Sequence, residues 1–318
     1  MNTTTTTVHG VLSSLSKTLL LLVAIAATAL HAGTAQAVIY GVDLENSIWE
    51  IDPVAKTTTK ILTSSEIGQT ANSLGYDQTR NQLFFINAAN TFDYWEGASN
   101  TIKSVGGLSL PLTSDPNNGA FYNDSFWYFE ANSNVLRQAT LSYTGSGPTA
   151  VPSVAVEPAS FTVLGMAPTG NNTNTFGDIA IDEFSGTLYA STSRGRFYSV
   201  DLSNPVTGFT EIVPSPGNNR TVGMQLSFDQ MTNTLYGHNY RSGDWFTIDT
   251  GTGAVTQIAG FNTLVAGGRG FRDLGGAAPV PEPSTIGLAA VGLVGGLGYT
   301  GIRRRRRKAE KAEATLAA

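Results

Sequence analysis

The chain has 318 residues, of which 41% are hydrophobic and 14% charged, so it carries enough apolar residues to form a folded core. Residues 38–281 hold 11 basic and 21 acidic residues, a formal charge of −10, without any basic cluster. This argues against nucleic-acid binding, because a nucleic-acid groove needs clustered cations to neutralise phosphates. The absence of cysteine excludes disulfides, thiolate metal sites and cysteine nucleophiles.

The N-terminal segment has the pattern of a secretory signal peptide. Lys17 precedes an apolar run at 18–30, and small residues follow it up to Ala35 and Ala37, which occupy the two alanine positions of an A-x-A cleavage site. The run is too short to span about 30 Å of hydrocarbon at about 1.5 Å per residue. We therefore predict an exported protein whose signal peptide, residues 1–37, is removed after Ala37.

The middle of the chain contains an internal repeat. In three segments an aspartate lies six positions before a leucine, and an aromatic residue follows that leucine. The segments are LGYDQTRNQLFF (74–85), IAIDEFSGTLYA (179–190) and LSFDQMTNTLYG (226–237). Two further strand-like runs follow the second and third segments, so the unit has four short strands with alternating hydrophobicity.

The unit length predicts a β-propeller. Asp182 and Asp229 are 47 residues apart, and a weaker copy at AFYND places Asp124 47 residues after Asp77. A Pro/Gly/Ser-rich insertion at 143–158 explains the longer distance to the next unit. A four-stranded antiparallel unit of this length is typical of a propeller blade, which usually has about 40 to 50 residues.

The two ends of the repeat region predict a closed ring. Residues 38–62 match the second to fourth strands of the unit, and the missing first strand is found in GFRDLGG at 270–276. Pairing these ends hides the sheet edges that an open array would expose. The fold class is therefore all-β, a propeller ectodomain over residues 38–278 with five blades. Six blades remain the alternative if 143–175 contains a degenerate copy, and a β-sandwich is the competing fold.

The repeated aspartates suggest two interpretations. They could form a ring of carboxylates, or each could cap the hairpin between the first two strands by accepting backbone N–H groups. We favour the turn interpretation, because a residue repeated at one position of every unit points to repeat architecture. The chain has no D-x-[DN]-x-[DN]-G calcium loop, and we predict no catalytic residue, no metal site and no cofactor.

One histidine remains after the signal peptide. His238 lies in HNYRSGDW at 238–245, together with Tyr240, Arg241 and Asp244. These polar groups could contact a ligand or act as an acid and base. We favour a solvated hairpin loop, since loops readily take such residues.

Asparagine-rich segments recur before the first strand of successive units. Propeller geometry places these segments and the loops between the second and third strands on one face. Amides beside aromatic rings suit a carbohydrate ligand, whereas asparagine also serves tight turns without any ligand. The predicted ligand face comprises Tyr94, Trp95, Asn117, Asn118, Asn171, Asn172, Asn218, Asn219, Arg220, Tyr240 and Arg241.

The C-terminal segment predicts one transmembrane helix. Residues 286–302 are uncharged, and six cations at 303–308 follow at once, so the positive-inside rule keeps that end cytoplasmic, with the tail 309–318. The basic stop comprises Arg303, Arg304, Arg305, Arg306 and Arg307. A simple anchor that dimerises through Gly292 and Gly296 is one interpretation.

A second interpretation rests on the residues before this helix, Val280, Pro281, Glu282, Pro283, Ser284 and Thr285. This motif, an apolar helix and an arginine cluster in that order resemble a PEP-CTERM sorting signal at 279–308. The resemblance implies recognition by an exosortase, a processing enzyme that removes the tail, and release from a membrane-anchored intermediate to the cell surface of a Gram-negative bacterium that makes exopolysaccharide.

The sequence leaves three functions open. The first is a non-enzymatic binding or structural module at the cell surface or in the extracellular matrix of a biofilm, associated with exopolysaccharide. The alternative is a secreted glycan-active enzyme, a hydrolase or a lyase, that uses the mouth of the propeller channel. A surface protein whose main partner is another protein is the third.

Overall fold

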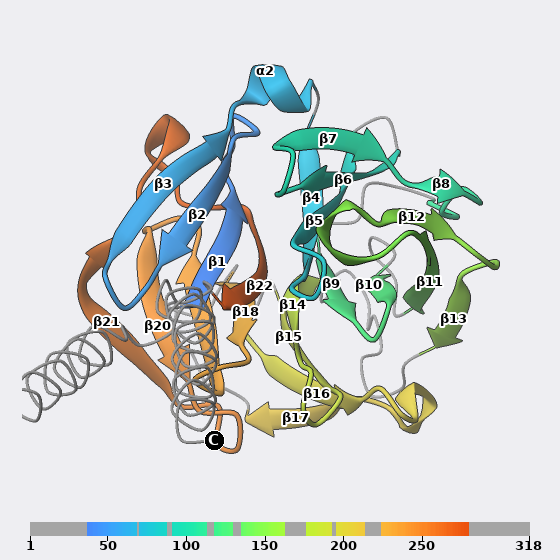
Figure 1. The fold of residues 1–318 in the computed structure, drawn as a ribbon. Helices are drawn as coiled ribbons and strands as arrows, with labels where there is room; N and C mark the ends of the chain where they lie inside the picture. The colour runs from blue at the N-terminus through green and yellow to red at the C-terminus, as the bar shows by residue number, and fades with distance from the viewer. Residues whose placement is uncertain are drawn as a thin grey trace, which may run out of the picture. The chain divides into compact units, whose positions relative to one another are not determined.

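The computed structural model describes residues 37–68, 70–87, 91–112, 118–129, 135–162, 176–192, 195–213 and 224–279. The described strands form five β-sheets, arranged as propeller blades around a central axis (Figure 1). The predicted signal-peptide residues 1–36, the sorting motif and the basic stop lie outside the described residues. Within the described part of the chain, no helix has the length and apolar character needed to cross a membrane.

The first blade is closed by both ends of the described chain, as the sequence predicted. Its strand order is β22-β1-β2-β3, and β22 runs antiparallel to β1 with Val38 opposite Ala278. This pairing hydrogen-bonds two strand edges that would otherwise be free to pair with another chain. The bounds are β1 (Ala37–Val42), β2 (Ile48–Asp52), β3 (Thr57–Leu62) and β22 (Asp273–Pro279). Helix α2 (Ser64–Ile67) leads to the second blade.

Three further blades are regular four-stranded antiparallel sheets in chain order. The second blade comprises β4 (Ala71–Asp77), β5 (Gln82–Asn87), β6 (Phe92–Glu96) and β7 (Thr101–Ser104). The fourth comprises β14 (Phe176–Asp182), β15 (Thr187–Thr192), β16 (Phe197–Asp201) and β17 (Thr210–Val213). The fifth comprises β18 (Met224–Asp229), β19 (Thr234–Asn239), β20 (Asp244–Ile248) and β21 (Val255–Asn262). The short helices η2 (Pro205–Thr207) and η3 (Ala266–Gly268) lie in connections.

The third blade is the irregular one, and the predicted insertion explains why. Its long strand β11 pairs with β10 and β13 over one half and with β12 over the other, and β12 also pairs with β8 after the second blade. The insertion thus forms part of a six-stranded sheet and adds no sixth blade. The bounds are β8 (Gly106–Gly107), β9 (Gly119–Tyr122), β10 (Ser125–Phe129), β11 (Val135–Thr144), η1 (Gly147–Thr149), β12 (Val151–Val154) and β13 (Ala159–Thr162).

The described residues form five hydrophobic core clusters, and each lies between two neighbouring blades. Between the second and third blades, for example, the rings of Phe84 and Phe121 stack with centroids 5.2 Å apart. Because both faces of the inner strands are covered, consecutive residues of β5, β10 and β18 are all buried. The outer strands β3 and β7 expose half or more of their residues, as expected at the rim of a propeller.

The inner strands meet closely at the axis. A Cβ on Gly75 of β4 would lie 2.9 Å from the Ala120 backbone of β9, and a Cβ on Gly119 would lie 2.6 Å from the Ser73 carbonyl oxygen. Side chains at these positions would therefore push two blades apart. A cavity that the inner strands line at the axis has a volume of about 20 Å³, which is too small for an organic ligand.

The repeated aspartates are turn residues, which confirms the interpretation that we favoured. The Oδ1 atoms of Asp77, Asp182 and Asp229 accept hydrogen bonds of 2.9 Å from the backbone N–H two residues later. The prediction that Asp124 occupies the position of Asp77 in its own unit is wrong. Asn123 and Asp124 form a two-residue hairpin with φ of 50° and 53°, a shorter turn than in the other blades.

Candidate ligand-binding site

Two aromatic residues of the predicted ligand face are buried. Tyr94 and Trp95 were expected in an exposed loop, but they belong to β6 and are 0% and 6% exposed. Tyr94 packs between the second and third blades, and Trp95 between the first and second, where its indole N–H donates to Asn100 Oδ1 at 2.9 Å. Their expected exposure is wrong, because alternate side chains of a blade strand enter the interfaces on its two sides.

Of the other residues of the predicted ligand face, three lie within the described ranges and the rest lie outside them. Asn118 is buried, and its Oδ1 accepts the Phe129 N–H at 2.9 Å, so its role is structural. Tyr240 is half-buried and Arg241 exposed in the turn after β19, and the guanidinium groups of Arg241 and Arg269 lie 5.8 and 5.7 Å from the Tyr240 ring centre. The remaining residues lie outside the described ranges, namely Asn117, Asn171, Asn172, Asn218, Asn219 and Arg220.

His238 is a core residue of β19, which corrects the expected loop position. It is 0% exposed and lies between the rings of Trp245 and Phe271, with centroids 4.5 and 5.4 Å away. Its Nε2 accepts the Phe271 N–H at 2.9 Å, and burial lowers its pKa to about 3. The imidazole is therefore neutral and holds the chain that leads into β22.

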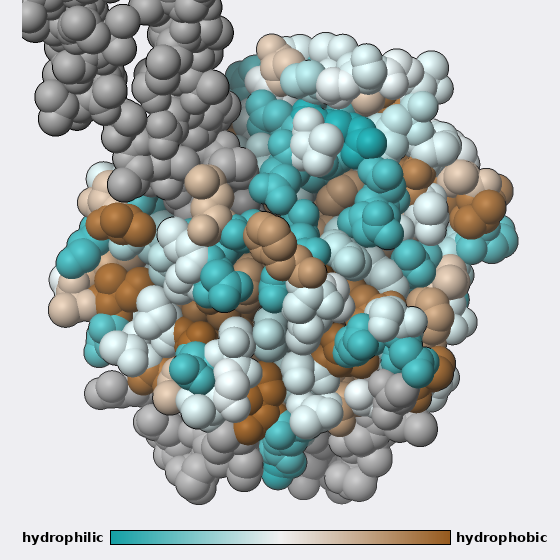
Figure 2. Space-filling model, turned by 60° about the horizontal axis from the view of Figure 1, so that its bottom comes forward, coloured by the Kyte–Doolittle hydropathy of each residue, from teal (hydrophilic) through white to brown (hydrophobic). Residues whose placement is uncertain are grey.

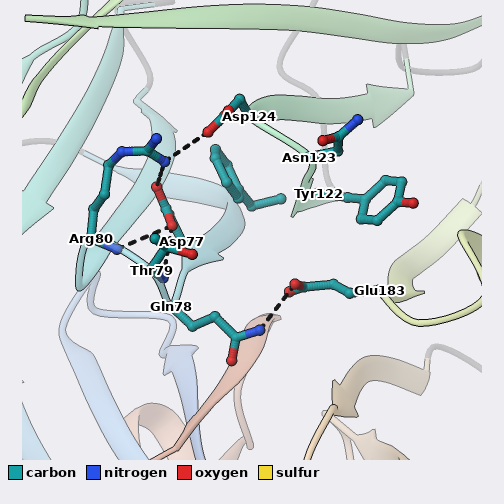
Figure 3. A pocket seen from close by; sticks show the side chains of 9 residues that line it. Asp77, Gln78, Thr79, Arg80, Tyr122, Asn123, Asp124 and Glu183 are labelled. Atoms are coloured by element: carbon teal, nitrogen blue, oxygen red, sulfur yellow. Dashed lines mark hydrogen bonds and ion pairs between the residues drawn. The ribbon is translucent and has the colours of Figure 1, made fainter. Parts of the chain in front are cut away.

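A polar cavity of about 430 Å³, here the first cavity, opens on the opposite side of the propeller from the predicted face. We call this side the turn face, defined by the turns that join the first two strands of the second to fifth blades, at 78–81, 123–124, 183–186 and 230–233. Three of these turns, from the second, third and fourth blades, meet around the cavity. It is lined by Asp77, Gln78, Thr79, Arg80, Phe121, Tyr122, Asn123, Asp124 and Glu183 (Figure 3).

Arg80 joins the second and third blades on one side of this cavity. Its Nη1 donates to Asp77 Oδ2 and Asp124 Oδ1, both at 2.7 Å, and its guanidinium lies 3.6 Å from the ring centre of Tyr143. Tyr143 comes from the insertion and also donates to Asp77 Oδ2 at 3.3 Å. Burial alone would lower the pKa of Arg80, but its hydrogen bonds and charge interactions, chiefly with Asp77, outweigh it and raise that pKa. The cation is held rigidly by its neighbours.

Glu183 lies at the other end of the first cavity, and Gln78 reaches towards it (Figure 3). Gln78 Nε2 donates to Glu183 Oε2 at 3.0 Å, and the Glu183 backbone N–H donates to Gln230 Oε1 at 2.9 Å. Burial raises the pKa of the Glu183 carboxyl, because the hydrogen bond from Gln78 does not fully stabilise the buried carboxylate. A ligand that donates hydrogen bonds to Glu183 or carries positive charge would stabilise this carboxylate further.

The chemistry of the first cavity suits a small polar ligand. Carboxylates and amides offer acceptors and donors in several directions, while Phe121 and Tyr122 provide ring edges and faces. The formal charge is −2, since three carboxylates face Arg80 alone. Sugar hydroxyls need such paired acceptors and donors, and sugar C–H faces pack on aromatic rings. The described residues include no group of three or more His, Cys, Asp or Glu side chains placed to hold a metal ion.

Two fully buried carboxyl groups meet near the axis, away from the first cavity. Asp178 of β14 and Asp273 of β22 hydrogen-bond to each other. Their oxygens also accept backbone N–H groups of the next blade, Leu226 at 2.9 Å and Leu74 at 2.7 Å. Burial raises both pKa values, that of Asp273 to about 7, and the pair shares a proton. The pair therefore connects the fourth blade to the first and the fifth, and the first blade to the second.

The turn-face residues were not predicted from the sequence. A signal was present, since Arg80 and Glu183 stand where the turn at 230–233 has Thr232 and Gln230. Their approach across blade boundaries was not visible, because Asp77 and Glu183 are far apart in the chain. The partner Tyr143 lies in a segment outside the repeat, so no alignment of repeats could have placed it beside Arg80.

Comparison with known proteins identifies the C-terminal signal. Residues 279–307 match the PEP-CTERM protein-sorting motif, so the chain carries this signal directly after β22. The motif implies an exported protein that an exosortase processes, through a membrane-anchored intermediate. No curated protein sequence matches the chain.

Solved structures with similar folds include three examples. One is a nidogen/laminin complex, with 8% identity, a TM-score of 0.44, and coverage of 75% of this chain and 97% of the other. The second is a catalytically inactive virginiamycin B lyase from Staphylococcus aureus with quinupristin, with 15% identity, a TM-score of 0.40 and 70% coverage of each chain. The third is a protein of unknown function from Bacteroides thetaiotaomicron, with 12% identity, a TM-score of 0.40, and coverage of 70% and 64%.

Proposed function

We propose that this protein is an exported, non-enzymatic glycan-binding module that acts at the cell surface or in the exopolysaccharide matrix of a Gram-negative bacterium. The observation that carries the proposal is the first cavity, in which carboxylates, amides, one fixed guanidinium and an aromatic wall converge from three blades. The sorting motif supports it, since an exported module would meet extracellular polysaccharide rather than cytoplasmic ligands.

Binding can be tested with the full-length chain purified in detergent. Its binding to exopolysaccharide from the source bacterium and to a glycan array is measured by titration calorimetry and array fluorescence. Replacing Tyr122→Ala removes a half-buried ring from the cavity wall, so we expect roughly a tenfold weaker affinity. Met231→Ala is the matched control, because this residue lies on the turn face but outside the first cavity.

The same samples distinguish binding from catalysis. Saturable binding without cleavage of the glycan supports the proposal. Release of shorter chains or of unsaturated ends would replace it with the hydrolase or lyase alternative, and Glu183, whose pKa is raised by burial, would then be the first candidate for a general acid. Absence of glycan binding together with specific capture of one protein would favour a protein partner.

The sorting part of the proposal has its own experiment. A chain that lacks residues 280–318 should no longer pass through the membrane fraction, whereas the full-length chain should appear there and then at the surface in a shortened form. Identical fractionation of both chains would contradict the role of the signal.

A further inference from the structure

A second cavity of about 260 Å³ adjoins the first on the turn face. Both cavities are lined by Tyr122 and Asn123, which therefore form a shared wall. The second cavity is lined further by Trp127, Gln138, Ser185, Gly186, Asp201, Leu202 and Ser203. Like the first cavity, the second combines an aromatic wall with amides, hydroxyls and a carboxylate. Its residues come from the third and fourth blades only.

Trp127 belongs to the wall of the second cavity. Its side chain is 3% exposed, and its indole N–H finds no acceptor among the described residues. The other three tryptophans donate to Asp43, Asn100 and Thr263, at 2.8 to 2.9 Å. Because the indole nitrogen has no accessible surface, a ligand in this cavity would meet the Trp127 ring rather than its N–H group.

Phe184 marks the border between the two cavities. Its neighbours in the turn line different cavities, Glu183 the first and Ser185 the second, while the Phe184 ring is 85% exposed. Exposure of a single apolar residue is common, and Figure 2 shows other hydrophobic residues as separate spots among hydrophilic ones. A ring at this border, however, is placed to pack against a chain that passes from one cavity to the other.

The charge of the two cavities restricts the kind of chain. Asp77, Asp124, Glu183 and Asp201 are opposed by Arg80, the one cation among the residues that line the cavities, which gives a formal charge of −3. Arg80 donates through Nη1 to both Asp77 and Asp124, so two carboxylates already balance its charge. A uronic acid chain would meet repulsion here, whereas a protonated amino group would find acceptors.

We infer that the two cavities are adjacent subsites for one linear glycan chain that carries free amino groups. This inference rests on the proposed function and names the ligand class of the same site. One sugar unit occupies the first cavity, where its ammonium group meets Glu183 and Asp124. The next unit occupies the second cavity, where its hydroxyls meet Asp201 and its C–H groups pack on the Trp127 ring. The chain crosses the Tyr122–Asn123 wall beside Phe184.

The experiment uses the full-length chain in detergent and titrates it with glucosamine and its oligomers up to the tetramer. An N-acetylglucosamine tetramer and a galacturonic acid tetramer are the comparison ligands. We expect the glucosamine tetramer to bind roughly tenfold or more tightly than the monomer, because it fills both subsites. The N-acetylated tetramer should bind more weakly than the glucosamine tetramer, and the galacturonic acid tetramer should not bind.

Two variants locate the second subsite. Asp201→Asn keeps the bond to the Ser203 N–H but removes the charge, so it should weaken binding of the tetramer roughly threefold and leave the monomer unchanged. Asp249→Asn is its matched control, since Asp249 occupies the same turn position in the fifth blade and lines neither cavity.

The outcomes separate the inference from the proposed function. If glycans bind but glucosamine and its tetramer have the same affinity, the inference is overturned and the proposed function stands. The same conclusion follows if the N-acetylated or the galacturonic acid tetramer binds with the affinity of the glucosamine tetramer. If no glycan binds, both fall. Equal effects of Asp201→Asn and Asp249→Asn would also overturn the inference, because the second cavity would then contribute nothing of its own.

Discussion

The fourth and fifth blades share one backbone plan and differ in their polar side chains. Asp178 and Glu183 of the fourth blade correspond to Gln225 and Gln230 of the fifth, while the turn aspartates Asp182 and Asp229 make the same hydrogen bonds. The fourth blade therefore places one carboxylate near the axis and another in the first cavity, whereas the fifth blade has amides at both positions and does not line that cavity. The repeat thus builds the scaffold, and a few departures from it supply the side chains of the candidate site.

The largest loss of stability is expected from substituting equivalent core leucines of the fourth and fifth blades. Leu188 and Leu235 occupy the same position in the two blades and are 0% and 1% exposed. Leu188→Ala and Leu235→Ala should each lower the free energy of unfolding by about 2 to 5 kcal/mol, because each leaves a cavity between two blades. Denaturant unfolding measures both, and a large change in only one of them would show that the blades do not contribute equally.

The pair of Asp178 and Asp273 should make stability depend on pH. Because burial raises the pKa of Asp273 to about 7, the folded protein keeps a proton that the unfolded chain loses near its ordinary value. The contribution of this pair to stability should therefore be largest below the ordinary carboxyl pKa and fall as pH rises towards 7, by up to about 4 kcal/mol. Asp178→Asn, which brings the fourth blade closer to the fifth, should flatten this slope, since an amide donates to Asp273 at any pH. Thermal unfolding across pH measures the slope, and an unchanged slope would contradict the shared proton.

Glu183→Gln converts the turn of the fourth blade towards that of the fifth. We expect roughly tenfold weaker glycan binding, about 1.5 kcal/mol, from loss of a charged acceptor. Stability should stay unchanged, because Gln230 occupies the same turn position in the fifth blade. Calorimetric titration with glucosamine oligomers measures the effect, and unaltered affinity would remove Glu183 from the site.

The smallest loss of glycan affinity is expected from substituting Phe184 in the exposed turn of the fourth blade. Phe184→Ala should weaken binding of an oligomer by about 0.5 to 1.5 kcal/mol, roughly two- to tenfold, through loss of a ring contact. Met231→Ala, at the same position in the fifth blade, should have no effect on binding. Titration of the two variants side by side gives the comparison, and equal behaviour would show that the Phe184 ring is not used.

Much of the scaffold could be predicted because it repeats. The spacing from Asp182 to Asp229, the strand missing from residues 38–62 and its counterpart at 270–276 led to five blades closed by the ends, and the structure has them. The burial of Tyr94, Trp95 and His238 was not predicted. Strand alternation suggests one exposed side, but a propeller covers both sides of its inner strands, so aromatic and polar residues enter the core.

The sorting signal and the propeller architecture of this protein can both be predicted from its sequence alone. A sorting motif is read from contiguous residues, and a repeat is read from its period, so neither needs contacts between distant residues. The position of the candidate site is visible only in the folded chain, because Arg80, Asp124, Tyr143 and Glu183 belong to different blades and to an insertion. Their meeting depends on how the blades pack around the axis, which no single repeat encodes.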